Sequence, residues 1–109
     1  MTMLSARFTQ SPVETKRYVM DYTLQLASGE SISSVAVNIV QTAGPTTGVP
    51  AFVINNTALL PPVNGVVLGA AFYASAGGNN CQYEVQFLAT TSIGQILEDI
   101  VQFVLAEKL

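Results

Sequence analysis

The sequence contains no histidine and a single cysteine, Cys81. Without histidine there is no Ser-His-Asp triad and no imidazole general base. One cysteine and no histidine also exclude a standard zinc site, and a lone cysteine cannot form a disulfide within the chain. A nucleophilic cysteine would need a base to generate its thiolate, so we interpret Cys81 as a half-buried thiol that packs as a small hydrophobic side chain.

Other residues that could support chemistry lack the partners they need. Glu98 and Asp99 are adjacent, so on a strand their carboxylates point to opposite faces. Gly77-Gly78 is not followed by the Lys-Ser/Thr of a phosphate-binding loop. The sequence therefore predicts no catalytic residue, no metal ligand and no cofactor site, and we do not expect an enzyme.

Positive charge is scarce. The formal net charge is −3, and the basic residues are Arg7, Lys16, Arg17 and Lys108. Phosphate contacts need a cluster of cations, so nucleic acid is not an expected partner. Prolines and glycines interrupt the most apolar region, residues 59–74, so we expect no membrane-spanning helix. The first residues do not have the pattern of a secretory signal, and no membrane partner is expected.

Charge is absent from the middle of the chain. No Asp, Glu, Lys or Arg lies between Ser31 and Tyr83, and charged residues make up 10% of the sequence, against about 25% in typical soluble proteins. A small domain cannot bury half of its length, so part of this segment must expose Ser, Thr, Asn, Gln, Gly and Ala. Either other protein covers this surface in a permanent assembly, because interface cores are depleted in charge, or it is a mild neutral surface. We favour the assembly.

Apolar residues that alternate with polar ones predict strands over 32–41 and 82–89. The same pattern predicts a strand in which Tyr18, Met20, Tyr22 and Leu24 share one face. A short strand over 52–54 is expected to stop at Asn55-Asn56, and another covers 66–74. About seven such segments separated by turns predict an all-β fold, namely an antiparallel β-sandwich. A length of 109 residues fits a single domain, 1–109, with 1–11 as a candidate N-terminal arm.

The last segment, residues 95–109, is ambiguous. As a strand it places Leu97, Val101, Phe103 and Leu105 on one face, with Asp99 interrupting the row. As a helix the same segment forms an amphipathic stripe. Periodicity alone does not separate the two.

Two groups of residues resemble a family of small immunoglobulin-like domains in virion proteins of tailed bacteriophages, described as structural or fibre proteins. The first group is Pro12, Glu14, Tyr18, Asp21, Tyr22, Leu26, Gly29, Glu30, Ser31 and Ile32. The second is Gly77-Gly78, Tyr83-Glu84-Val85 and Thr90-Thr91-Ser92-Ile93-Gly94. The resemblance implies an immunoglobulin-like sandwich, location in the virion, and a strand rather than a helix over 95–105.

These observations lead to one main functional hypothesis and one alternative. The main hypothesis is a structural component of a phage particle, as a head-decorating, head-fibre, connector-associated or tail-associated protein. Its partners would be capsid, connector or tail subunits, and it would be a homo-oligomer or present in many copies, assembled through shape complementarity and β-edge pairing.

The alternative is a receptor- or carbohydrate-binding module that uses loop residues Asn55, Asn56, Asn79 and Asn80. The tyrosines Tyr18, Tyr22, Tyr73 and Tyr83 could line a sugar site. We interpret them as core residues, because three of them fall on the apolar faces of predicted strands.

Overall fold

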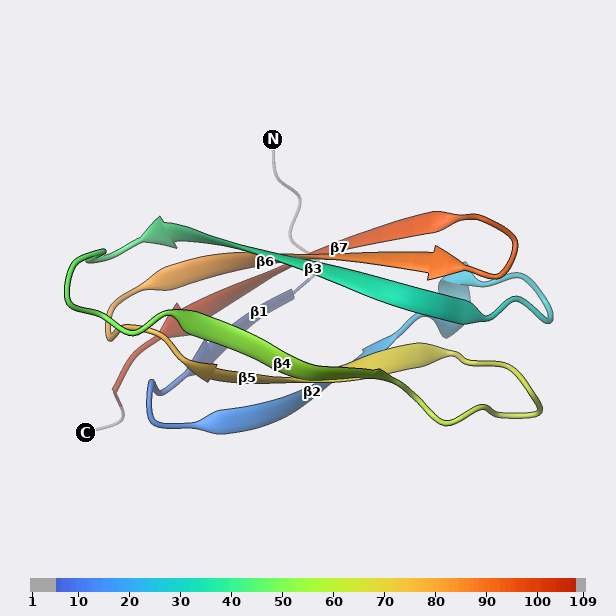
Figure 1. Cartoon of the computed structure of the whole chain (residues 1–109), viewed down its shortest axis with the longest axis horizontal. Helices are drawn as coiled ribbons and strands as arrows, with labels where there is room; N and C mark the ends of the chain where they lie inside the picture. Colours follow the sequence, from blue (N-terminus) through green and yellow to red (C-terminus); the bar gives the residue numbers. More distant parts are fainter. Residues whose placement is uncertain (1–5, 108–109) are drawn as a thin grey trace.

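The computed structural model describes residues 6–107, which form seven strands and one 3-10 helix (Figure 1). The elements are β1 (Ala6–Gln10), β2 (Thr15–Asp21), η1 (Thr23–Gln25), β3 (Ile32–Ala43), β4 (Phe52–Leu59), β5 (Gly69–Ala76), β6 (Gln82–Thr91) and β7 (Ile96–Leu105).

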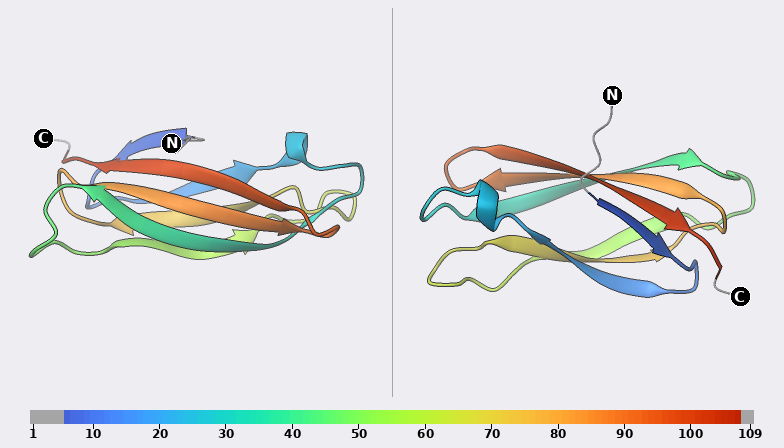
Figure 2. Two further views of the ribbon diagram at one scale, coloured as in Figure 1. Left: turned by 90° about the horizontal axis from the view of Figure 1, so that it is seen from above. Right: turned by 180° about the vertical axis from the view of Figure 1, so that it is seen from behind.

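The strands form two sheets that pack face to face. One sheet has the order β1-β7-β6-β3 and the other the order β2-β5-β4, and the two layers are visible in Figures 1 and 2. This confirms the predicted β-sandwich, and the β3-β6-β7 and β2-β5-β4 groupings are those of immunoglobulin-like sandwiches. All strand pairs are antiparallel except β1 with β7, which run parallel.

The core lies between the sheets and is rich in phenylalanine. On β6, Tyr83, Val85, Phe87 and Ala89 are buried while the intervening residues are partly exposed, as the alternation predicted. The ring centroids of Phe72 and Phe87 lie 4.7 Å apart across the two sheets. Burial of such apolar side chains is the main stabilising contribution to the fold.

The ambiguous C-terminal segment is a strand, β7. Val101, Phe103 and Leu105 are buried on its inner face, and Leu97 and Asp99 share that face, since they lie opposite the inward-facing Ala89 and Phe87. The strand expectation that came from the resemblance is therefore confirmed.

Two expectations about strand ends were wrong. β2 ends at Asp21, and Leu24 is fully exposed in η1 rather than on the inner face. The Asp21 carboxylate accepts hydrogen bonds from the N–H and the hydroxyl of Thr23, and this side-chain turn stops the strand. β4 does not stop at Asn55-Asn56 but continues to Leu59, because a bulge with Asn56 at φ 51° absorbs the break in alternation.

β1 was not predicted as a strand. Its inward positions are Ala6, Phe8 and Gln10, so a polar residue interrupts the apolar row. Gln10 is nevertheless fully buried, because its amide donates to Ala74 O at 2.7 Å and its oxygen accepts from the Tyr18 hydroxyl at 2.9 Å. Of the candidate arm, residues 1–5 lie outside the described residues.

Candidate functional site: an edge without charge

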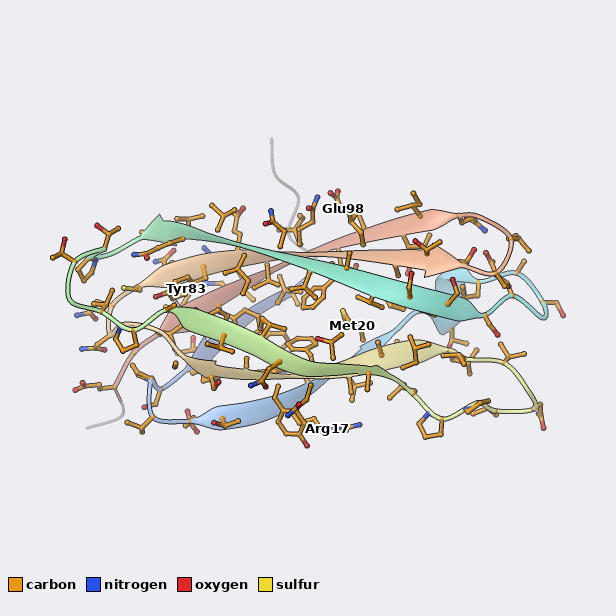
Figure 3. The ribbon with its side chains drawn as sticks, in the orientation of Figure 1. Arg17, Met20, Tyr83 and Glu98 are labelled. Carbon is orange, nitrogen blue, oxygen red and sulfur yellow. The ribbon has the colours of Figure 1, made fainter. Side chains whose placement is uncertain are left out.

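The residues considered for chemistry are dispersed. Cys81 is fully buried, beyond the half-buried state expected, with its Sγ 3.4 Å from Pro45 O. Glu98 points out from the four-stranded sheet (Figure 3) and accepts a hydrogen bond from Gln86 at 2.6 Å, whereas Asp99 is hydrogen-bonded to Tyr22. Residues 6–107 contain no cluster of three or more potential metal ligands. Within the same range no helix is long and apolar enough to cross a membrane.

The tyrosines are largely structural. Tyr22 and Tyr83 are buried, and Figure 3 shows Tyr83 between the sheets. Burial first, and the Asp99 carboxylate second, raise the pKa of Tyr22 far above its ordinary value of 10.0. Tyr18 and Tyr73 are partly exposed; the pKa of Tyr18 is raised by burial and then by the charge of Glu14.

The four asparagines proposed for sugar binding lie on different elements. Asn55 and Asn56 lie in the bulge of β4, whereas Asn79 and Asn80 lie in the turn between β5 and β6. The Asn79 side chain accepts a hydrogen bond from the Glu107 N–H at 2.9 Å. The structure therefore brings no asparagine loop cluster together.

The charge-free segment, by contrast, forms a continuous region. β3 is one of the two outer strands of the four-stranded sheet, and β4 is one of the two outer strands of the three-stranded sheet. Figures 1 and 2 show both strands on the same side of the sandwich, joined by the loop 44–51. We call the exposed residues of β3, this loop and β4 the neutral edge. Nearly every residue of this loop is exposed, and so is most of each strand.

The neutral edge is more apolar than the sequence suggested. Besides small polar side chains it exposes Val37 (36%), Val40 (51%), Val53 (37%) and Leu59 (41%). The expectation of a surface made only of Ser, Thr, Asn, Gln, Gly and Ala was therefore incomplete. Val40 and Val53 lie on the outer faces of the two different sheets, so these side chains are spread around the edge. Exposed apolar side chains on strands without charge are typical of surfaces that contact other proteins.

The backbone of this edge is also open. β3 is 12 residues long and within residues 6–107 has a strand neighbour on one side only. Proteins usually protect such edges with charged side chains or bulges. β3 has register shifts near both ends, at Ile32/Ser34 and Gln41/Ala43, but carries no charge between them. A strand of a partner could pair with its central part.

Charged residues lie elsewhere. Arg7 is on β1, and Lys16, Arg17 and Asp21 are on β2, at the back of the molecule as drawn in Figure 1. Glu84, on β6, lies opposite Val40 in the register and is the neighbouring charge on the outer face of that sheet. The sandwich thus has a neutral side and a charged side.

Comparison with known protein families relates the chain to a phage family. Residues 10–104 match the model of a family described as podophage GP4 fiber-tail adaptor protein gp77. No curated protein matches the chain.

Proposed function

The chain belongs to the podophage fiber-tail adaptor family, and we propose that it acts by docking its neutral edge on another virion protein. It is a structural component of the phage virion and not an enzyme. Among the positions that the sequence left open, the family description favours one between fibre and tail over head decoration. Its partners in that position are fibre and tail subunits.

The observation that carries this proposal is the absence of charge from two adjacent edge strands. Burying an ion removes it from water at a cost of several kcal/mol, which its new partners must offset. β3 and β4 avoid this cost, because their exposed side chains are neutral. Burial of an exposed apolar side chain such as Val40 adds a favourable contribution on the order of 25 cal/mol per Å² of apolar surface buried.

Two modes of contact fit this edge. Side chains of β3 and β4 can pack against an apolar surface, and the open backbone of β3 can pair with a partner strand. The bulge at Asn55–Ala58 disturbs the ladder of β4, so β3 is the better strand for pairing.

The test is incorporation of variants into particles that lack the native protein. Val40→Lys places a cation on the outer face of β3, where Val40 is half exposed, so folding is preserved but docking requires burial of an ion. Leu24→Lys is the matched control, because Leu24 is fully exposed in η1, outside the neutral edge.

We expect Leu24→Lys to be incorporated like the native chain, and Val40→Lys to be reduced by about tenfold or more, as measured by mass spectrometry of purified particles. The thermal unfolding midpoints of both variants should match that of the native chain. Incorporation of Val40→Lys at the native level would refute docking through β3.

A further inference from the structure

We propose that the charged side of the sandwich binds a second copy of this chain, through antiparallel pairing of β2 with β2 of that copy. β2 is the other outer strand of the three-stranded sheet, in the order β2-β5-β4. Figure 2 shows it on the side opposite β3 and β4. This dimer goes beyond docking of the neutral edge, because it uses a different surface and a different partner.

Hydrogen bonds at the end of β2 show which backbone groups face the open edge. The Tyr22 N–H donates to Leu68 O at 2.9 Å, so Tyr22 is bonded toward β5. Gly69 lies opposite Asp21, and its carbonyl accepts from the Leu60 N–H on the β4 side at 3.0 Å. Asp21 is therefore at a non-hydrogen-bonded position of the β2–β5 pair, and its own N–H and C=O point away from β5.

The same orientation recurs at every second residue of a strand. Arg17 and Val19 therefore also present their N–H and C=O groups to the open edge, together with those of Asp21. The side chains of all three residues are exposed, and Val19 is 52% exposed. A strand added here meets both unpaired backbone groups and accessible side chains.

The charges of β2 select one register for a two-fold pair. When Val19 faces the partner's Val19, Arg17 faces the partner's Asp21, and the symmetry repeats this ion pair. Directly opposed cross-strand charges of opposite sign are stabilising, whereas like charges are destabilising. A register centred on Arg17 instead places the two arginines face to face. β2 is thus complementary to itself in the register centred on Val19.

Apolar surface beside β2 fits the same partner. A cleft of about 180 Å³ opens between β1, β7 and β2, and its lining includes Phe8, Val19 and Met20. Phe8 is 36% exposed on β1. Figure 3 shows Met20 between the sheets and Arg17 on the outer side. A second copy paired on β2 covers the mouth of this cleft and the exposed ring.

The balance of charge also suits two identical surfaces. The net charge of the chain is −3, so two copies repel at long range. Arg7, Lys16 and Arg17 nevertheless all lie on β1 and β2, where Glu14 and Asp21 balance them; Lys16 Nζ is 3.9 Å from Glu14 Oε2. The surface that would be shared is close to neutral overall while carrying both signs.

Charge reversal tests the dimer. The dissociation constant of the purified full chain is measured by analytical ultracentrifugation for the native protein, Arg17→Glu, Asp21→Arg and the double variant. Each single variant opposes like charges at two symmetric positions and should weaken the dimer by about tenfold or more. The double variant restores opposite charges and should recover the native constant to within severalfold. Glu84→Arg, with the same change in net charge as Asp21→Arg, is the control on β6, away from β2.

Amide hydrogen exchange of the native chain provides a readout that does not depend on folding of the variants. The amides of Arg17, Val19 and Asp21 should exchange more slowly as protein concentration rises. Those of Tyr18 and Met20, at positions bonded to β5, should not respond. A native chain that stays monomeric, or single and double variants of equal affinity, would overturn the proposal. Neither result would bear on docking through the neutral edge.

Discussion

Two fully buried polar residues, Gln10 and Glu30, hold together segments that are distant in the sequence. The Gln10 amide donates to Ala74 O, and its oxygen accepts from the Tyr18 hydroxyl. These bonds join β1, β2 and β5 at one end of the sandwich. Buried polar groups are stable only when they are hydrogen-bonded, so Gln10 fixes the position of a strand that apolar patterning alone did not reveal.

Glu30 has a corresponding role at the other end. Its carboxylate accepts from the Ala27 N–H at 2.7 Å and from the Gln95 amide at 2.9 and 3.1 Å, and it is also hydrogen-bonded to the Thr91 side chain. The bond with Thr91, followed by that with the Ala27 backbone, lowers the pKa of Glu30 below its ordinary value of 4.5. The ionised form is therefore the one that the fold stabilises.

This lowered pKa predicts a loss of stability in acid. Because the folded pKa lies below the unfolded value, the contribution of Glu30 is fully present above pH about 4.5 and is lost as the pH falls through the folded pKa. The Glu30→Gln variant should lack this part of the acid dependence. The acid dependence is measured from the urea unfolding midpoints of the native chain and of Glu30→Gln between about pH 7 and pH 2. Parallel curves for the two proteins would contradict the assignment.

At the scale of elements, sequence reasoning succeeded where one face of a strand is buried without interruption. On β6 buried and partly exposed residues alternate without a break. On β3 Val35 and Ile39 pack against the core but Val37 is 36% exposed. Both strands were predicted close to their observed bounds. Sequence reasoning failed where a local side chain or bulge ended or shifted the pattern, as at Asp21 and Asn56. Such breaks depend on hydrogen bonds and positive φ angles, which periodicity does not encode.

The residues that carry the family resemblance include pairs that meet in space. The Ser31 N–H donates to Ser92 Oγ at 3.0 Å, and the Ser92 N–H donates to Ser31 O at 2.8 Å. Gly78 N–H donates to the Tyr83 hydroxyl at 3.1 Å. These motif residues could be identified from the sequence. The hydrogen bonds that join them, between Ser31 and Ser92 and between Gly78 and Tyr83, are visible only in the structure.

Gly69 offers a test of how closely β2 and β5 pack. A Cβ added at this glycine would clash with the carbonyl oxygen of Met20, so β2 would have to move. We expect Gly69→Ala to lower the free energy of unfolding by about 1–3 kcal/mol, as overpacking commonly does. Chemical denaturation measures the change.

Ser75→Ala, on the same strand, is the comparison for this prediction. Ser75 is partly exposed, so its replacement should stay within about 0.5 kcal/mol. Equal effects of the two variants would show that β2 can shift without cost, and that the edge proposed for dimer formation is loosely held.

At the scale of the whole molecule, the neutral edge was predictable only in part. The sequence shows a long charge-free segment and indicates that some of it faces outward. It does not show that β3 and β4, which belong to different sheets, lie on one side of the sandwich. The strand order places the charge-free β3 and β4 at one side of the sandwich, where they form a continuous surface. The same strand order places Arg7 on β1 and Lys16 and Arg17 on β2, at the other side.

The two sides should therefore respond differently to salt. Ion pairs between exposed Arg17 and Asp21 side chains are screened as the Debye length falls from about 10 Å at 0.1 M to about 3 Å at 1 M salt. We expect the dissociation constant of the β2-mediated dimer to rise severalfold over this range. Docking through the neutral edge involves uncharged side chains such as Val40, so salt has no ion pair to screen there. Apolar burial does not weaken with added salt. Incorporation into particles should thus stay nearly constant over the same range. A dimer that is insensitive to salt would mean that Val19 and Phe8, rather than the charges, hold it together.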